Sequence, residues 1–315
     1  MSDKLILGSR GSQLALWQTE WVKAMLEKTF PKLHVEIRLI KTKGDKILDS
    51  PLSKIGDKGL FTREIEQAML DNQIDAAVHS LKDLPTQLPE GLCIGAIGKR
   101  EDARDVFIAN TKKGYKRFEE LSGGATIATS SLRRKSQLLH ARPDLNIVDV
   151  RGNLNTRLAK LDESDWDGMI LARAGVIRLG FDNRITETLS FEQMLPAVGQ
   201  GALAVEIREN DHRIEEYFQP LNSQPTNIST CGERALLRYL EGGCQIPIGA
   251  YGRIEDNVFQ LDALIGSIDG KKIVRGKIHG KPEESEPLGK SLAKSLLECG
   301  GKEILDSIRT TEDGH

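Results

Sequence analysis

The sequence predicts an α/β protein of more than one domain, and three observations support that prediction. The chain has 315 residues, which is enough for two or three domains that each bury a core. Strand-like and helix-like patterns alternate through residues 5–180, as they do in α/β domains with mostly parallel sheets. Beyond a polar, proline-bearing stretch at 220–227, the order becomes helix, strands and helix, which is typical of a small α+β unit.

The elements of the first part follow from periodicity and capping. Residues 5–9 are an apolar run that predicts a strand, and Ser12 can cap a helix over 13–30, whose apolar residues keep roughly helical spacing. Residues 34–42 alternate with a period of two, as strand residues do. The same criteria predict a helix over 61–70 and strands over 75–80 and 93–98.

The pattern resumes after residue 100. Predicted strands are 105–110, 126–130, 146–150 and 168–172, the last leading into residues 174–180, and predicted helices are 132–143 and 154–163. Two close glycines from Pro196 onward indicate a hinge or crossover before a strand over 202–207. After the predicted linker at 220–227 we expect a helix over 230–243, strands over 258–267 and 271–280, and a helix over 286–301. Residues 111–124 are interpreted as a surface insertion without a catalytic role.

Composition argues against several classes of function. The formal net charge of −2 gives no general attraction to nucleic acid or anionic membranes, and aromatic residues are sparse at 5%. No apolar run approaches the roughly 20 residues of a membrane span, and the N-terminus does not have the pattern of a signal peptide. The four cysteines are too widely spaced for a disulfide framework or a zinc site, so we expect no metal and a reducing cytoplasm.

Polar clusters follow five of the predicted strands. They are SRGS from Ser9, HSLKD from His79, TSSLRR from Thr129, RGN from Arg151 and ARAG from Ala172. Ligands of open α/β sheets bind outside the carboxyl ends of strands, so we interpret these clusters as one binding region; charged surface loops are the alternative for any single cluster. Arginines dominate, which favours a polyanionic ligand: Arg10, Arg133, Arg134, Arg151, Arg157 and Arg178.

Two of these arginines and one acid have specific alternatives. Arg133 and Arg134 are either solvated charges at an exposed helix N-terminus or, because that end disfavours cations, the mark of an anion bound there. Asp83 is the one acid in a basic neighbourhood, where it can stabilise a developing cation or carry protons; the alternative is a turn cap before Pro85. His79 is interpreted as a satisfied core histidine.

Seven motifs, in order, give the chain a resemblance to a known family. They are GSRGSQLALWQ (8–18), GDKGLFTREIE (56–66), DAAVHSLKDLP (75–85), TSSLRRKSQL (129–138), RGNLNTRL (151–158), LPAVGQGAL (195–203) and EGGCQIPIG (241–249). Over essentially its full length the chain resembles the porphobilinogen deaminase, or hydroxymethylbilane synthase, family. The motifs depart from the family pattern at Arg173, where a small or apolar residue is usual, and at Asn155, where glycine is common.

The resemblance implies three domains and a monomer. Two doubly wound α/β domains similar to periplasmic binding proteins are expected over 1–100 plus 202–219 and over 101–201, with the active site between them. A small α+β domain over 225–315 should carry the cofactor cysteine. The first domain is then discontinuous, because the chain returns to it after the hinge.

The resemblance also implies the reaction. It is a transferase reaction of tetrapyrrole (haem) biosynthesis, in which four porphobilinogen molecules are joined head to tail with loss of ammonia and released as hydroxymethylbilane. The chain grows on a dipyrromethane cofactor, held by a thioether to the residue that matches Cys244, which lies on a glycine turn. Asp83 matches the catalytic carboxylate, which assists departure of ammonia and stabilises the resulting azafulvenium-like cation. No nucleic acid or membrane partner is implied.

The remaining site residues are implied position by position. Cofactor contacts are expected at Lys82, Thr129, Ser130, Ser131, Arg133 and Arg134. Substrate or chain contacts are expected at Arg10, Ser12, Lys58, Phe61, Arg151, Arg157, Arg178 and Gln200.

Two functions of other classes explain less of the sequence. A non-catalytic anion-binding protein on a periplasmic-type scaffold accounts for the arginines and the hinge, but it needs neither Asp83 nor a thiol on a glycine turn, and it should carry a signal peptide. A nucleic-acid-binding module accounts for basic clusters but conflicts with the net charge and the few aromatic residues.

Overall fold

The computed structural model describes residues 3–46, 62–240 and 246–313. They form two compact units. Unit 1 contains the described parts of residues 1–50, 57–101 and 201–227, and unit 2 contains residues 102–200 and the described parts of 228–315. Division into three domains at the boundaries given above stays a prediction. Among the described residues, no helix combines the length and apolar character that a membrane crossing requires.

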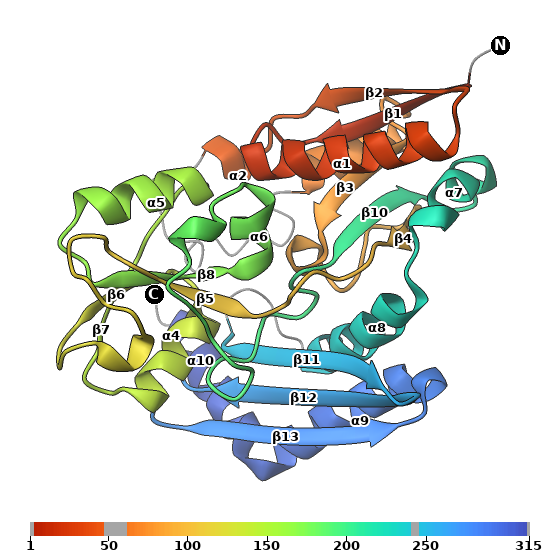
Figure 1. Ribbon diagram of the computed structural model, residues 1–315. Helices are drawn as coiled ribbons and strands as arrows, with labels where there is room; N and C mark the ends of the chain where they lie inside the picture. The colour runs from red at the N-terminus through yellow and green to blue at the C-terminus, as the bar shows by residue number, and fades with distance from the viewer. Residues whose placement is uncertain (1–2, 47–61, 241–245, 314–315) are drawn as a thin grey trace. The chain divides into compact units, whose positions relative to one another are not determined.

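Unit 1 is built on a five-stranded sheet in the order β2-β1-β3-β10-β4. Its strands are β1 (Asp3–Ser9), β2 (Leu33–Leu39), β3 (Ala76–Ser80), β4 (Leu92–Ile97) and β10 (Leu203–Arg208). Helices α1 (Gln13–Thr29) and α7 (His212–Phe218) (Figure 1) pack on one face through a shared apolar core. Helix α3 (Arg63–Leu70) packs on the other face. Shorter helices complete the unit: α2 (Lys43–Lys46), η2 (Leu81–Asp83) and η5 (Gln219–Leu221).

Unit 2 contains a second five-stranded sheet, in the order β7-β6-β8-β5-β9. Its strands are β5 (Asp105–Ala109), β6 (Thr126–Ala128), β7 (Asn146–Val148), β8 (Gly168–Ala172) and β9 (Glu187–Thr188). Helix α4 (Leu132–Ala141) packs on one face, and α5 (Leu154–Glu163) and α6 (Arg173–Arg178) pack on the other. Two 3-10 turns complete this part: η3 (Phe118–Glu120) and η4 (Asp182–Arg184).

The two large sheets share one plan. In each, three parallel strands are followed by a fourth that runs antiparallel to both its neighbours, β10 in unit 1 and β5 in unit 2. The α/β prediction is confirmed, with helices on both faces of each sheet, but the sheets are mixed rather than mostly parallel. The reason is that β5 and β10 each follow a connection from the other five-stranded sheet and enter their own sheet in the opposite direction.

The C-terminal part of unit 2 is an antiparallel sheet in the order β11-β12-β13, covered by helices. The strands are β11 (Ile248–Glu255), β12 (Val258–Gly266) and β13 (Ile273–Gly280). The helices are α8 (Gln224–Tyr239), α9 (Ser285–Leu296) and α10 (Lys302–Asp313), with the turns η6 (Pro282–Glu284) and η7 (Leu297–Gly301). The predicted α+β character of this part is confirmed.

Two interpretations from the sequence need correction. The predicted linker 220–227 is partly helical, because α8 begins at Gln224, and Pro225 is tolerated in a first turn where its missing N–H costs nothing. The stretch 111–124 is not wholly a surface insertion, because Phe118 and Leu121 are buried in the core of unit 2. The Phe118 amide donates to Glu187 Oε2 at 2.6 Å, which ties this segment to β9.

Candidate functional site

The five polar clusters all follow strands of the parallel parts of the two large sheets. In unit 1, Arg10 and Ser12 come after β1, and Lys82 and Asp83 come after β3. In unit 2, Thr129–Arg134 follow β6, Arg151 lies beyond β7, and Arg173 begins the helix after β8. Since the carboxyl ends of neighbouring parallel strands meet at one edge, each unit gathers its clusters at one edge of its sheet.

Unit 1 presents its polar residues on short, well-anchored turns. Ser12 is the N-cap of α1, and its Oγ accepts from the Ala15 amide at 3.3 Å. Arg10 and Lys82 are half-buried, whereas Asp83, the last residue of η2, is exposed. The exposed carboxylate is therefore accessible to a ligand, and its backbone is held in a defined turn by the bond from Leu84 N to Leu81 O.

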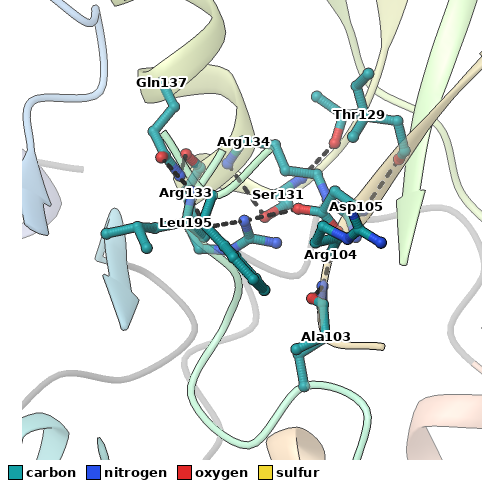
Figure 2. A network of polar contacts seen from close by, with 12 residues as sticks. Ala103, Arg104, Asp105, Thr129, Ser131, Arg133, Arg134, Gln137 and Leu195 are labelled. Atoms are coloured by element: carbon teal, nitrogen blue, oxygen red, sulfur yellow. Dashed lines mark hydrogen bonds and ion pairs between the residues drawn. The ribbon is translucent and has the colours of Figure 1, made fainter. Parts of the chain in front are cut away.

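Unit 2 buries two guanidinium groups around one carboxylate (Figure 2). Arg133 Nη1 donates to Asp105 Oδ2 at 2.8 Å, and Arg134 Nη2 donates to Asp105 Oδ1 at 2.8 Å. Arg133 also donates to Leu195 O and Arg134 to Ile170 O. Both arginines are about 95% buried, so the interpretation of solvated charges is wrong. Asp105 is therefore an anion at this helix N-terminus, and it belongs to the protein itself.

The electrostatics of this group follow from burial and charge. Burial alone would raise the pKa of Asp105, but Coulombic attraction and hydrogen bonds from Arg133 and Arg134 outweigh it and hold that pKa far below its ordinary value. Burial lowers the pKa of Arg133, an effect that Asp105 partly offsets and Arg134 increases. Two guanidinium groups share one carboxylate, so these three side chains carry a net charge of about +1.

Gln200 belongs to the same network. Its Nε2 donates to Ala103 O at 2.7 Å and to Asp105 Oδ1 at 2.9 Å, and its side chain is buried. Gln137 Nε2 donates to Leu195 O, and Leu195 N returns a bond to Gln137 Oε1. The segment from Leu195 to Gln200 is therefore fastened to the arginine pair through Asp105 and Gln137, two residues that sequence reasoning missed. A charged residue opening the apolar strand DVFIA was the available signal for Asp105.

The other predicted residues of unit 2 lie on the adjoining turns. Ser131 caps α4, Ser131 N donates to Thr129 Oγ1, and Ser130 Oγ exchanges hydrogen bonds with Val150 O and Val150 N. These bonds tie the turn after β6 to the turn after β7. Arg157 Nε donates to Gly152 O at 2.8 Å, and Arg178 is buried in the last turn of α6.

Two buried guanidinium nitrogens lack an acceptor among the residues that the structure describes. They are Arg134 Nε and Arg151 Nη2. Buried N–H groups are costly without a partner, so both are suited to a carboxylate ligand. Arg173 pairs with Asp102 at 3.6 Å, a carboxylate that Arg104 already binds with two nitrogens.

Three predicted residues, Lys58, Phe61 and Cys244, lie outside the described residues. Of the cysteines inside them, Cys93, Cys231 and Cys299 are free thiols. No group of three or more His, Cys, Asp or Glu side chains in the described part of the chain is arranged to hold a metal ion.

Fold and site together define a class: an α/β protein whose cationic side chains gather at the carboxyl ends of its parallel strands. Residues 5–216 match the family model described as porphobilinogen deaminase, dipyromethane cofactor binding domain, and residues 228–298 match the one described as porphobilinogen deaminase, C-terminal domain. The chain belongs to the porphobilinogen deaminase family.

Curated relatives agree with the family models. The porphobilinogen deaminase of Chloroherpeton thalassium is 54% identical over 314 residues, which cover 98% of this chain and 99% of the relative. That of Carboxydothermus hydrogenoformans is 55% identical over 309 residues, 98% of each chain. Among solved structures, the methionine-binding protein MetQ is a distant match, with 13% identity and a TM-score of 0.45 over 70% of this chain and 90% of its own.

Proposed function

We propose that this chain condenses porphobilinogen with loss of ammonia, joining four molecules head to tail into hydroxymethylbilane, and that Asp83 is its catalytic residue. Membership of the family over nearly the whole chain supports the activity. The observation that supports the role of Asp83 is its placement: an exposed carboxylate at the carboxyl end of β3, beside Lys82 and one strand away from Arg10.

The residues present fit a dipyrromethane cofactor, whose acetate and propionate groups are anionic. Arg134 Nε and Arg151 Nη2 are buried without acceptors among the described residues, and the Asp105 group has a surplus of positive charge. We expect Cys244 to hold the cofactor covalently and Lys82, Thr129, Ser130, Ser131, Arg133 and Arg134 to contact it. When bound, the cofactor supplies a free pyrrole carbon as the acceptor for the first condensation.

The chain's own residues then have three tasks. The carboxylates of porphobilinogen bind to the guanidinium groups of Arg10, Arg151, Arg157 and Arg178. Further contacts come from Ser12, Lys58, Phe61 and Gln200. Asp83 accepts and returns protons as ammonia leaves, and its charge stabilises the cation that develops on the incoming substrate. The turn of η2 keeps the carboxylate oriented for this purpose. We further propose a monomer that acts in the cytoplasm, as the resemblance implies.

Asp83→Asn tests the catalytic role. The variant keeps the shape of the side chain but removes its charge and basicity, so kcat should fall by about 10²- to 10⁴-fold. Asp71→Asn is the matched control, because Asp71 is an exposed acid at the end of α3 in the same unit. Turnover would be measured on protein whose intact mass includes the cofactor. An Asp83→Asn enzyme with the turnover of Asp71→Asn refutes the proposed role.

A further inference from the structure

Three titratable side chains that the proposed function does not use meet inside unit 1. Glu66 belongs to α3, His79 to β3 and Glu206 to β10, and their exposed fractions are 6%, 6% and 0%. His79 Nε2 lies 3.1 Å from Glu206 Oε2. We refer to these three residues as the buried triad.

Strand register explains why they meet. Glu206 lies opposite Ala77 on β3, and His79 is two residues from Ala77, so His79 and Glu206 face the same side of the sheet. That side is covered by α3, whose Ile65 and Met69 pack against Ala77. Glu66, next to Ile65 on the helix, is buried on this same side of the sheet.

The triad has more carboxylate oxygens than the described residues supply hydrogen-bond donors for. Among the described residues, Glu66 Oε1 and both carboxylate oxygens of Glu206 accept no hydrogen bond, because the 3.1 Å contact from His79 Nε2 to Glu206 Oε2 does not have hydrogen-bond geometry. The pKa of Glu66 is raised, mainly by burial and also by the nearby charge of Glu206. The Thr62 hydroxyl, His79 and Arg63 lower this pKa, but their combined effect is smaller. Cys93 on β4 lies on the opposite face of the sheet, in the core shared with α1 and α7, where burial above all raises the pKa of its thiol. The arrangement favours a neutral Glu66 beside the contact between His79 and Glu206.

The triad is connected to the turn that carries Asp83. Beyond His79, β3 continues directly into η2, which holds Lys82 and Asp83. Leu81 N donates to Ala202 O at 3.0 Å, and Leu81 and Leu84 pack against Ala202 and Ala204 at the start of β10. The position of β10 against β3 therefore determines where the turn lies, and Glu206 is buried where β10 meets β3 and α3.

We infer that Glu66, His79 and Glu206 act as one positioning unit for the condensation, holding the Asp83 turn in place only while Glu66 carries a proton. The inference rests on the proposed function, because it takes Asp83 as the catalytic group. Ionisation of Glu66 puts a second negative charge next to Glu206, which pushes α3 away from the β3–β10 pair and displaces the turn. Activity should therefore fall at alkaline pH before the protein unfolds.

Glu66→Gln tests the protonation step, because glutamine has the shape of the neutral acid and cannot ionise. The ratio of kcat at pH 8.5 to kcat at pH 6.5 should be higher in Glu66→Gln than in the wild type. Because the pKa of Glu66 is raised in the folded protein, ionisation of Glu66 should lower the free energy of unfolding of the wild type as the pH rises. Urea unfolding should show that Glu66→Gln lacks this contribution. Glu209→Gln, an exposed acid directly after β10, is the control and should keep the wild-type ratio.

Glu206→Gln and His79→Gln test the positioning step. Each removes one partner of the contact between His79 and Glu206, so kcat should fall by about 10- to 100-fold, as expected when a catalytic group is displaced, while KM changes little because the arginines of unit 2 are intact. Circular dichroism and urea unfolding at the assay temperature would establish the folded fraction of each variant. If either variant does not fold, the pH ratio of Glu66→Gln decides alone.

The outcomes separate this inference from the proposed function. The inference is overturned if Glu66→Gln and Glu209→Gln have the same ratio of kcat at pH 8.5 to kcat at pH 6.5. It is also overturned if kcat of Glu206→Gln and His79→Gln falls only in proportion to the folded fraction. An inactive Asp83→Asn alongside those results leaves the proposed function standing. An active Asp83→Asn with the expected triad results removes Asp83 as the catalytic group, and the triad then positions another residue of the same turn.

Discussion

At the scale of single residues, Asp105 determines whether the two arginines of unit 2 can be buried. Its two carboxylate oxygens accept from Arg133, Arg134 and Gln200, and it is wholly buried. Without it, two guanidinium groups would repel each other in a medium of low polarity. The same carboxylate holds Gln200, so it also fixes the segment that leads from unit 2 toward β10.

Asp105→Asn should destabilise the protein by about 3–5 kcal/mol, because it leaves buried charges without a counter-ion. Since the pKa of Asp105 is held below its ordinary value of 3.8, its stabilisation is complete above that pH and is lost as the pH falls below it. Urea unfolding between pH 3 and pH 7 measures both effects. A variant within about 0.5 kcal/mol of the wild type at pH 7 would show that the pair does not depend on Asp105.

The sequence could indicate that Arg133 and Arg134 need an anion but could not identify it. Two cations at a helix N-terminus are locally unfavourable, which is a signal that residues 129–134 contain by themselves. Asp105 is 28 residues from Arg133 in sequence, and it reaches the pair only because β5 inserts antiparallel beside β8. That insertion depends on how the whole sheet assembles, which no local pattern records.

At the scale of elements, Gly168 shows how tightly β8 is packed. A Cβ at this position would run into the ring of Phe107 and lie 2.8 Å from Ile108 O, so even one methyl group cannot be accommodated without a shift of β5. Gly168→Ala should therefore lower the free energy of unfolding by about 1–3 kcal/mol, measured by urea unfolding.

Gly123→Ala is the matched control for that prediction. Gly123 has ordinary backbone angles, and the nearest atom to a Cβ there is an Asp144 oxygen at 3.9 Å. The substitution should change stability by no more than about 0.5 kcal/mol. Equal effects of the two substitutions would contradict the packing argument.

Element prediction succeeded where periodicity was undisturbed. Residues 154–163 and 168–172 have the predicted bounds, because an apolar stripe in the one and a continuous apolar run in the other are local signals. β11 was missed because Gly249 and Gly252 interrupt its alternation, and they are glycines because Leu195 O and Ser229 O approach closely. Helix α10 was missed because Gly300 suggested an end, whereas its φ of 105° introduces only a kink.

At the scale of the whole molecule, the cofactor should increase stability. The carboxylates of the bound cofactor supply acceptors to Arg134 Nε and Arg151 Nη2, and a ligand that binds only the folded state stabilises it. Wild-type protein produced with porphobilinogen present should have an intact mass above the sequence mass, and it should melt higher than Cys244→Ala, by about 2–4 °C for each kcal/mol gained.

Cys299→Ala is the control for that comparison, because Cys299 is an exposed thiol at the kink between α9 and α10. It should keep both the added mass and the higher melting temperature. A wild-type mass equal to that of the sequence, or an adduct that persists in Cys244→Ala, would sink the assignment of Cys244.

The shared plan of the two sheets has a consequence for how the chain is made. Among the strands that the structure describes, β4 is hydrogen-bonded only to β10, so the first sheet begun on the ribosome remains a three-stranded fragment, β2-β1-β3, until Leu203–Arg208 have emerged. All strands of the second five-stranded sheet, from Asp105 to Thr188, are synthesised before that point. At about 5–20 residues per second, the wait from β4 to β10 lasts several seconds. The five-stranded sheet of unit 1, which is begun first, is therefore completed after the five-stranded sheet of unit 2.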